Sequence, residues 1–281
     1  MSEMPRDDRV LLLTRIIAAA VIFILVLAVL SLYLLPDTTD QNFAWTIKPR
    51  MMAMAIGAGY LMGAYFFARV LTARRWHRVA GGYLSITAFT IAMALATILH
   101  WERFHQGDWH FVLWAVVYGL TPFLVPLVWW RNQRTDTRVP EADDYTLPQL
   151  LRSVAGIVGV AALLAAVLVF LQPERAISLW PWSLTPLTAR VLAGWMMLPA
   201  IGGLYLMREP RWSASRVLFE AVTVGAAFFL IALIVSWSDL SPTNLLRWGM
   251  ALGTALTVVF VPVAIVAFDR RRRPTLARTH R

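Results

Sequence analysis

Cysteine is absent from the 281 residues, and lysine occurs only once, at Lys48. A chain without cysteine has no disulfide, no thiolate metal ligand and no nucleophilic thiol, and cysteine usage says nothing about its compartment. No lysine lies inside an apolar run, so a retinal-type Schiff base is not expected either. These two absences remove several kinds of covalent and metal chemistry.

Charge is also scarce. Charged residues make up 15% of the chain and hydrophobic residues 59%, against about 25% and about 45–50% in a typical soluble protein. The apolar residues gather into runs of roughly twenty, the length that crosses the hydrocarbon core of a bilayer as a helix. The composition therefore predicts an all-α integral membrane protein.

Eight such runs are present, and each predicts one transmembrane helix. The first is too long for a typical signal-peptide core and precedes no A-x-A cleavage pattern, so we expect it to be retained. The expected spans are about 12–35, 51–71, 79–100, 109–130, 149–171, 185–206, 215–237 and 246–268.

Basic residues are distributed unevenly between the connections. Twenty of the 26 lie at the chain ends and in the second-to-third, fourth-to-fifth and sixth-to-seventh connections, which share one side of the membrane. The positive-inside rule then predicts that both termini are cytoplasmic. The basic C-terminal stretch is explained by contact with anionic lipid, so no nucleic-acid partner is expected. An arginine-rich, lysine-poor composition suggests a GC-rich bacterial genome, and the expected location is the plasma (inner) membrane.

The two halves resemble each other at an offset of 137 residues, which becomes 136 after the second span. The aligned positions include tryptophan, proline and arginine, which shared apolar composition alone would not align. Examples are Arg15 with Arg152, Pro36 with Pro173, Trp45 with Trp182, and the Arg-Trp pairs at 75–76 and 211–212. Since each half holds an even number of spans, we predict two tandem four-helix repeats in parallel orientation, related by an axis along the membrane normal.

This repeat divides the chain into four parts. Residues 1–131 form the first half, 132–148 a polar cytoplasmic linker, 149–270 the second half and 271–281 a basic tail. In each half the connection after the first span, at 36–49 and 172–186, is long and semi-polar and ends in proline. We expect a short helix or turn in each of these two connections.

Three of the five histidines fall in the connection between the third and fourth spans, "LHWERFHQGDWHF" at 99–111. Together with two carboxylates they offer ligands that suit zinc, copper or iron. The candidate metal ligands are His100, Glu102, His105, Asp108 and His110. Successive histidines are five apart, about 140° around a helix, so they do not share one helical face. A polar interfacial loop, a metal site and a haem site all remain open.

Two charged residues lie inside the spans. Arg190 is expected near the outer end of the sixth span and Glu220 near the cytoplasmic end of the seventh. Intramembrane charge is costly unless it is paired or hydrated, so both are candidate functional residues. They lie near opposite faces of the membrane and are not expected to pair. No charge lies near a predicted midplane, which disfavours a proton-relay transporter.

The sequence predicts architecture better than activity. Nucleotide-binding glycine motifs are absent and no Ser/His/Asp arrangement stands out. We therefore expect a non-enzymatic polytopic membrane protein that moves or binds a small solute, or that serves as a partner of another membrane protein. No cofactor is expected, and the lipid bilayer is the expected environment. The alternative is a membrane redox or metal-dependent protein that uses the outward His/Glu/Asp cluster.

Overall fold

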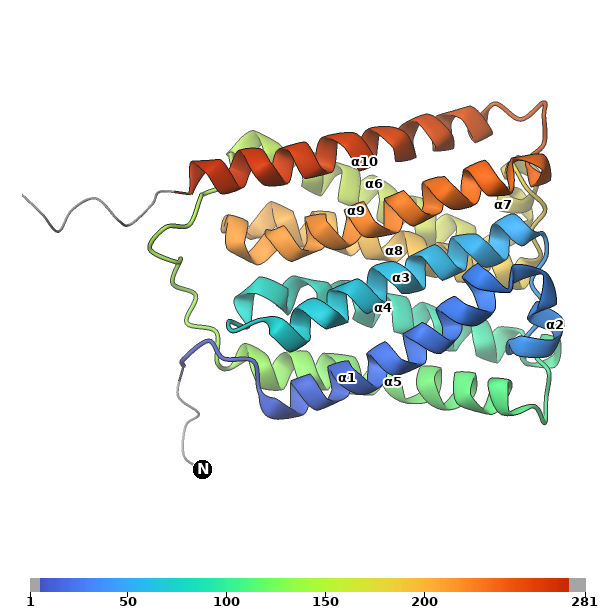
Figure 1. Cartoon of the computed structure of the whole chain (residues 1–281), viewed down its shortest axis with the longest axis horizontal. Coiled ribbons are helices and arrows are strands. Elements are labelled where there is room, and N and C mark those ends of the chain that lie inside the picture. The colour runs from blue at the N-terminus through green and yellow to red at the C-terminus, as the bar shows by residue number, and fades with distance from the viewer. Residues whose placement is uncertain (1–5, 273–281) are drawn as a thin grey trace, which may run out of the picture.

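The computed structural model describes residues 6–272 and is helical, with no β-strand among those residues. The predicted basic tail, 271–281, lies outside the described residues except for its first two positions. Eight long helices run side by side along the long axis of the molecule (Figure 1). They are α1 (Leu12–Val29), α3 (Arg50–Thr72), α4 (His77–Leu99), α5 (Trp109–Gln133), α6 (Gln149–Leu171), α8 (Pro186–Arg208), α9 (Trp212–Val235) and α10 (Leu246–Arg271).

All eight are long and apolar enough to cross a membrane, α1 being extended by a π-helical turn to Leu34. This confirms the prediction of eight helices with the length and composition to span a membrane, with ends that differ from the expected ones by a few residues. The short helices expected after the first span of each half are also present. They are α2 (Thr39–Asn42) and α7 (Pro173–Leu179).

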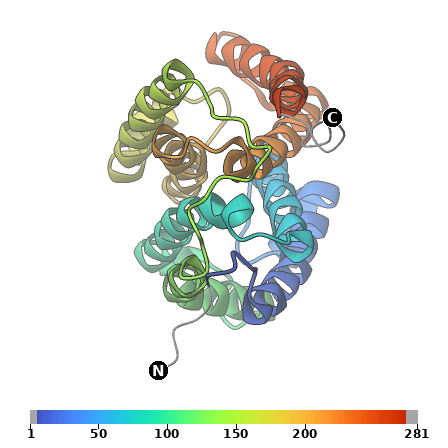
Figure 2. The same cartoon turned by 90° about the vertical axis from the view of Figure 1, so that its left-hand side faces the viewer.

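The long helices form an inner group and an outer group. In the inner group α3 packs against α9, and α4 packs against both α8 and α9. Each inner helix carries one outer helix: α1 lies on α3, α5 on α4, α6 on α8 and α10 on α9. In the end-on view, residues 12–133 occupy the lower part of the bundle and residues 149–271 the upper part, with the linker crossing between them (Figure 2).

Glycine allows one of these contacts, that of α6 with α8, to be very close. A Cβ on Gly159 of α6 would lie 2.8 Å from the carbonyl oxygen of Ala200, and one on Gly203 of α8 would lie 2.6 Å from that of Ala155. Backbone atoms cannot rotate aside, so only glycine permits α6 and α8 to approach this closely. By contrast, α10 fully buries none of its residues.

The interior of the bundle is filled by aromatic side chains. Trp195 of α8 packs edge-on against Tyr60 of α3 and at a tilt against Phe89 of α4. The hydroxyl of Tyr60 lies 2.9 Å from that of Tyr118 on α5. These rings are packed together in the core, whereas the ion pairs of the described residues lie toward the two ends of the helices.

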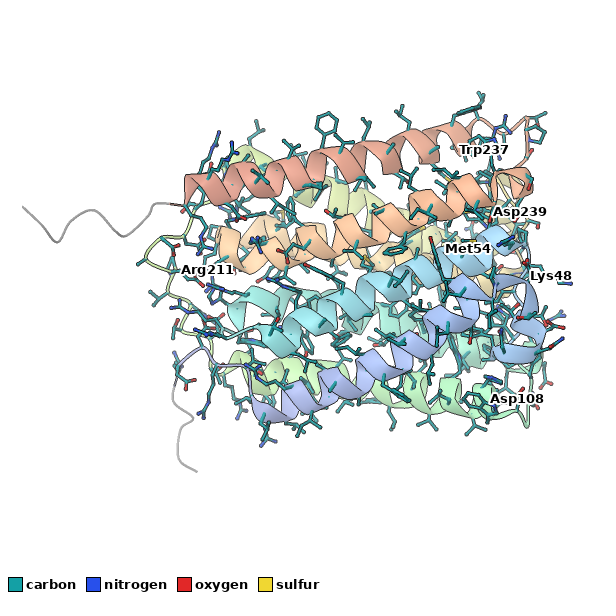
Figure 3. All side chains as sticks on the ribbon, viewed as in Figure 1. Lys48, Met54, Asp108, Arg211, Trp237 and Asp239 are labelled. Carbon is teal, nitrogen blue, oxygen red and sulfur yellow. The ribbon has the colours of Figure 1, made fainter. Side chains whose placement is uncertain are left out.

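We call these ends the linker end and the histidine end. The linker end comprises the linker, the turn between α3 and α4, and the connection between α8 and α9, which contains Arg211. The histidine end comprises the connection between α4 and α5, which contains Asp108. Arg211 and Asp108 lie at opposite ends of the bundle (Figure 3).

Candidate functional site

The rings of the three histidines at the histidine end share no hydrogen-bond partner. The ring of His105 contacts the carbonyl oxygen of Phe43 through Nδ1 and the hydroxyl of Thr46 through Nε2, both at 3.1 Å. His110 Nδ1 lies 2.7 Å from Asp108, whose carboxylate also caps α5 by accepting the backbone N–H of His110. These bonds connect the loop to its neighbours in the same half.

His100 has its partner in the other half of the chain. Its Nε2 lies 2.7 Å from Nη1 of Arg190, whose Nε donates to the carbonyl oxygen of Phe170. Burial, together with the charges of Arg190 and Arg103, lowers the pKa of His100. A neutral imidazole that accepts from a guanidinium has its Nε2 lone pair engaged.

No group of three or more histidine or carboxylate side chains in residues 6–272 is arranged to hold a metal ion. Of the five candidate ligands, Glu102 is exposed on the short helix at Trp101–Arg103, while the three histidines are engaged as described. The backbone N–H of His110 is the main reason that the pKa of Asp108 is lowered. The metal hypothesis therefore stays a prediction without a coordinating arrangement to support it.

The two intramembrane charges also have separate partners. Arg190 binds His100 and the carbonyl oxygen of Phe170 at the histidine end. Glu220 accepts from the hydroxyl of Tyr65 at 3.0 Å and pairs with Arg69 at 3.3 Å and with Arg216, one turn earlier on α9. Glu220 thus belongs to a larger charged cluster at the linker end, most of which sequence reasoning did not identify.

The centre of that cluster is His77, the first residue of α4. Its Nδ1 lies 2.5 Å from Asp8 and its Nε2 lies 2.9 Å from the hydroxyl oxygen of Ser213, the second residue of α9. Glu141 of the linker lies 3.3 Å from the same Nε2. His77 is 1% exposed, so the N-terminal segment, the linker and both halves meet at one buried imidazole.

Asp8, His77 and Ser213 are the residue types of a catalytic triad, but their hydrogen bonds run in directions that differ from those of a catalytic triad. The hydroxyl of Ser213 donates to Asp144 at 2.5 Å, so its single proton points away from His77. The imidazole must then donate to Ser213 through Nε2 and to Asp8 through Nδ1. A ring that donates on both sides carries a positive charge and is not a base for the serine.

The charges around His77 are balanced by arginine. Arg78 binds Glu141 through Nε and Nη2, both at 2.7 Å, and Arg272 binds it through Nη2 at 2.7 Å. Although burial acts in the opposite direction, the hydrogen bonds from His77 and Arg78 hold the pKa of Glu141 far below its usual value. Glu141 is therefore a carboxylate at neutral pH, and it links the linker to both halves.

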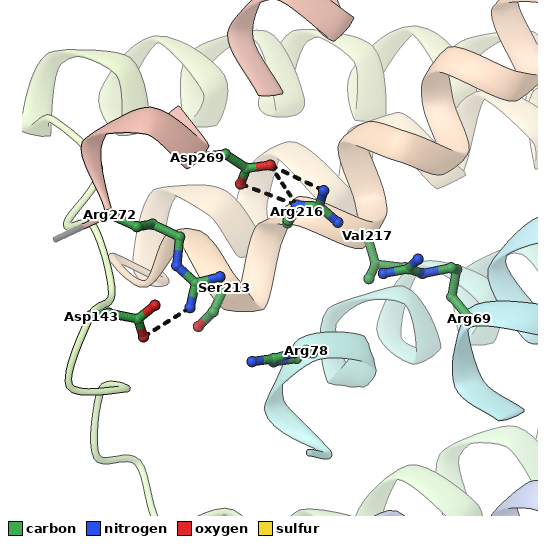
Figure 4. A pocket seen from close by; sticks show the side chains of 8 residues that line it. All are labelled: Arg69, Arg78, Asp143, Ser213, Arg216, Val217, Asp269 and Arg272. Carbon is green, nitrogen blue, oxygen red and sulfur yellow. Dashed lines mark hydrogen bonds and ion pairs between the residues drawn. The ribbon is translucent and has the colours of Figure 1, made fainter. Parts of the chain in front are cut away.

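A cavity of about 410 Å³ opens beside this cluster. Its walls come from α3 and α4 of the first half, α9 and α10 of the second half, and the linker (Figure 4). The lining residues are Arg69, Arg78, Asp143, Ser213, Arg216, Val217, Asp269 and Arg272. Four guanidinium groups thus face a space between the halves against two carboxylates.

The signal that could have located this site is the repeat that the sequence predicts. The two Arg-Trp pairs at 75–76 and 211–212 mark the starts of α4 and α9, next to His77 and Ser213. The repeat alignment does not indicate how far apart those two helix starts lie in the folded protein, so the sequence left the cluster unassigned.

Comparison of the chain with protein-family models, curated proteins and solved structures finds no match.

Proposed function

We propose that this chain is a non-enzymatic, multi-pass membrane protein that binds a small solute at the junction of two four-helix halves. The observation that carries the proposal is the cavity of about 410 Å³ at the linker end, which both halves and the linker line. Small-molecule sites span about 300–1,000 Å³ and favour interfaces between structural units. A second cavity, beside Tyr60 and Tyr118, is smaller, at about 80 Å³.

The proposal includes the tandem repeat, and matched contacts support it. Hydrogen bonds in the first half have counterparts 136 or 137 positions later. The bond of His77 to Asp8 corresponds to that of Ser213 to Asp144, and the bond of Arg15 to Leu71 corresponds to that of Arg152 to Met207. The bond of Trp76 to Gln133 corresponds to that of Trp212 to Asp269, and the bond of His105 to Ala44 corresponds to that of Ser241 to Pro181. Two halves that repeat these contacts would be related by a pseudo-twofold axis, and the cavity lies at their junction, beside this axis.

We place the linker end, and with it both termini, on the cytoplasmic side of a bacterial plasma membrane. The support is the excess of arginine in the segments at that end, as the positive-inside rule requires. In this orientation the cavity opens toward the cytoplasm, and the histidine end faces outward.

The alternative, a metal-dependent or redox protein built on the histidine loop, would require His100 and His105 to exchange their present partners for a metal. Stoichiometric metal or a visible haem band that disappears in His100→Ala and His105→Ala would therefore overturn the non-enzymatic proposal. Elemental analysis and an absorption spectrum of the purified protein make this test.

A thermal-unfolding screen tests solute binding directly. A solute that binds only the folded protein raises its midpoint temperature. The screen uses anions (phosphate, citrate), cations (choline, spermidine) and neutral solutes (glucose, glycerol). Asp143→Trp should block the cavity, whereas Ala142→Trp changes an exposed neighbour outside the lining. We expect one solute class to stabilise the wild type and Ala142→Trp only. The proposal would be contradicted if a solute raised the midpoint temperature of both variants equally, or if no solute class stabilised the wild type.

A further inference from the structure

We propose that the ligand of the linker-end cavity is a phosphate-bearing anion. This inference rests on the proposed function and specifies the ligand class. The lining contributes four guanidinium groups, those of Arg69, Arg78, Arg216 and Arg272, against the two carboxylates of Asp143 and Asp269. Glu141 and Glu220, which lie outside the lining, pair with the same arginines, so the ligand is inferred from the donors that these pairs leave unused and not from an excess of charge.

The arginines retain donors that the protein does not use. Arg78 binds Glu141 through Nε and Nη2, which leaves its Nη1 hydrogens for another acceptor. Arg272 binds Glu141 and Asp143 through Nη2, and no hydrogen bond within the described residues uses its Nη1. An anion in the cavity would supply acceptors for these unused Nη1 donors.

The arginines are not part of the repeated scaffold. At positions 136 residues away, Arg69 corresponds to Tyr205, and Arg78 and Arg216 correspond to alanines. Val217 of the lining corresponds to Gly81. The Tyr205 ring lies so close to Gly81 that a Cβ there would be 2.4 Å from Cε1. The counterpart site is thus filled by a tyrosine packed on a glycine, while the cavity site carries Arg69 and Val217.

This difference makes the cavity a specialised feature of one side of the pseudo-twofold axis. A scaffold that needed four arginines for stability would use them at both equivalent places. Here the second place is closed by an aromatic ring, and only the first retains an arginine-lined space. The fold pairs each of these arginines with a carboxylate, so the difference between the two places, and not the charge itself, is the feature that a ligand explains.

Phosphate is the anion that this lining fits best. Guanidinium groups form paired, charge-assisted hydrogen bonds with phosphate oxygens, and the four arginines approach from α3, α4, α9 and the segment after α10. A volume of about 410 Å³ leaves room for the group to which the phosphate is attached. That group is either a lipid, which would enter from the adjacent bilayer interface, or a soluble metabolite.

Equilibrium binding to the full chain in a neutral detergent tests the proposal. The probes are inorganic phosphate, glycerol 3-phosphate and dihexanoyl phosphatidic acid, with choline and glucose as non-anionic references. We expect at least one phosphate compound to bind more tightly than both references. Tighter binding of the phosphatidic acid assigns the lipid source, and tighter binding of glycerol 3-phosphate assigns the soluble source.

One substitution that should weaken binding and one that should tighten it separate an effect on binding from an effect on folding. Arg78→Gln should weaken binding at least about tenfold, since a hydrogen bond to a charged group contributes about 1.5–3 kcal/mol. Arg74→Gln, at an exposed arginine in the turn between α3 and α4, should leave binding unchanged. Asp143→Asn removes a lining carboxylate and should tighten binding about twofold to fivefold. If Arg78→Gln does not fold, the tightening in Asp143→Asn still tests the proposal.

Two results would overturn the inference. One is phosphate binding that Arg78→Gln and Arg74→Gln change equally and that Asp143→Asn does not tighten. The other is a cationic or neutral solute that stabilises the wild type and Ala142→Trp but not Asp143→Trp, while phosphate compounds do not bind. The second result would leave the proposed solute-binding function standing, whereas failure of every solute class would remove that function too.

Discussion

The imidazole Nε2 of His77 lies 2.9 Å from the hydroxyl oxygen of Ser213, although the two residues are 136 positions apart. This contact joins the first turns of α4 and α9. Each residue also binds its own aspartate through both its backbone N–H and its side chain: His77 binds Asp8, and Ser213 binds Asp144. The junction of the two halves is therefore a buried polar network, which is stable only when every member has a partner.

Ser213→Ala tests this network. The substitution removes the donor to Asp144 and the acceptor for His77, so we expect the free energy of unfolding to fall by about 1–3 kcal/mol. Unfolding in mixed micelles with rising denaturing detergent measures the change. Ser215→Ala is the matched control, because that buried hydroxyl binds only the carbonyl oxygen of Arg211 at the start of its own helix. Equal losses in both variants would argue against the network.

Glu141 makes the stability of the protein dependent on pH. Its pKa is lower in the folded protein than in the unfolded chain, so the unfolded chain binds the proton more tightly. The stabilisation is fully present at neutral pH and is lost as the pH falls below the ordinary glutamate value of about 4.3. We expect Glu141→Gln to flatten this acid-side decline in thermal midpoint. Glu174→Gln, on exposed α7, should keep the wild-type profile.

The orientation is open to a labelling test, because the chain contains no cysteine. Gln106→Cys introduces a thiol at the histidine end and Val139→Cys introduces one in the linker, both at exposed positions. In intact cells a membrane-impermeant maleimide should modify only the first, and permeabilisation should expose the second. The reverse pattern would invert the topology and place the cavity on the outer side.

Arg190 supports the histidine end through two hydrogen bonds to other elements. Arg190→Gln should lower the free energy of unfolding by about 1.5–3 kcal/mol, since it removes charge-assisted donors to His100 and to the carbonyl oxygen of Phe170. Arg175→Gln, exposed on α7, serves as control. Detergent unfolding curves compare the two, and a neutral result for Arg190→Gln would show that these bonds do not contribute.

Glycine positions distinguish packed helix faces from open ones. Gly203→Ala should destabilise the protein by about 1–3 kcal/mol, because the new Cβ meets backbone atoms of α6. Gly253→Ala on α10 meets nothing within 4 Å and should be neutral, or stabilising by up to about 1 kcal/mol through higher helix propensity. Thermal midpoints measured in the same detergent make the comparison. A similar response at both sites would contradict the close approach of α6 and α8.

Much of the architecture could be read from local pattern. Apolar runs of about twenty residues predict the eight long helices, because crossing a bilayer requires that length and composition within one continuous segment. The semi-polar, proline-ended connections likewise predict α2 and α7. The histidine loop was also placed correctly between α4 and α5, although its pattern of residue types did not indicate which partner each histidine would bind.

What the sequence by itself determined is therefore the set of helices, since each depends on residues that are neighbours in the chain. Only the tertiary structure decided which polar side chains meet. Asp8, His77, Glu141 and Ser213 come from four segments, and the arginines of the cavity come from four elements. Their proximity depends on how α3, α4, α9 and α10 pack, and packing between apolar helices in lipid is set by shape and small residues rather than by any local signal.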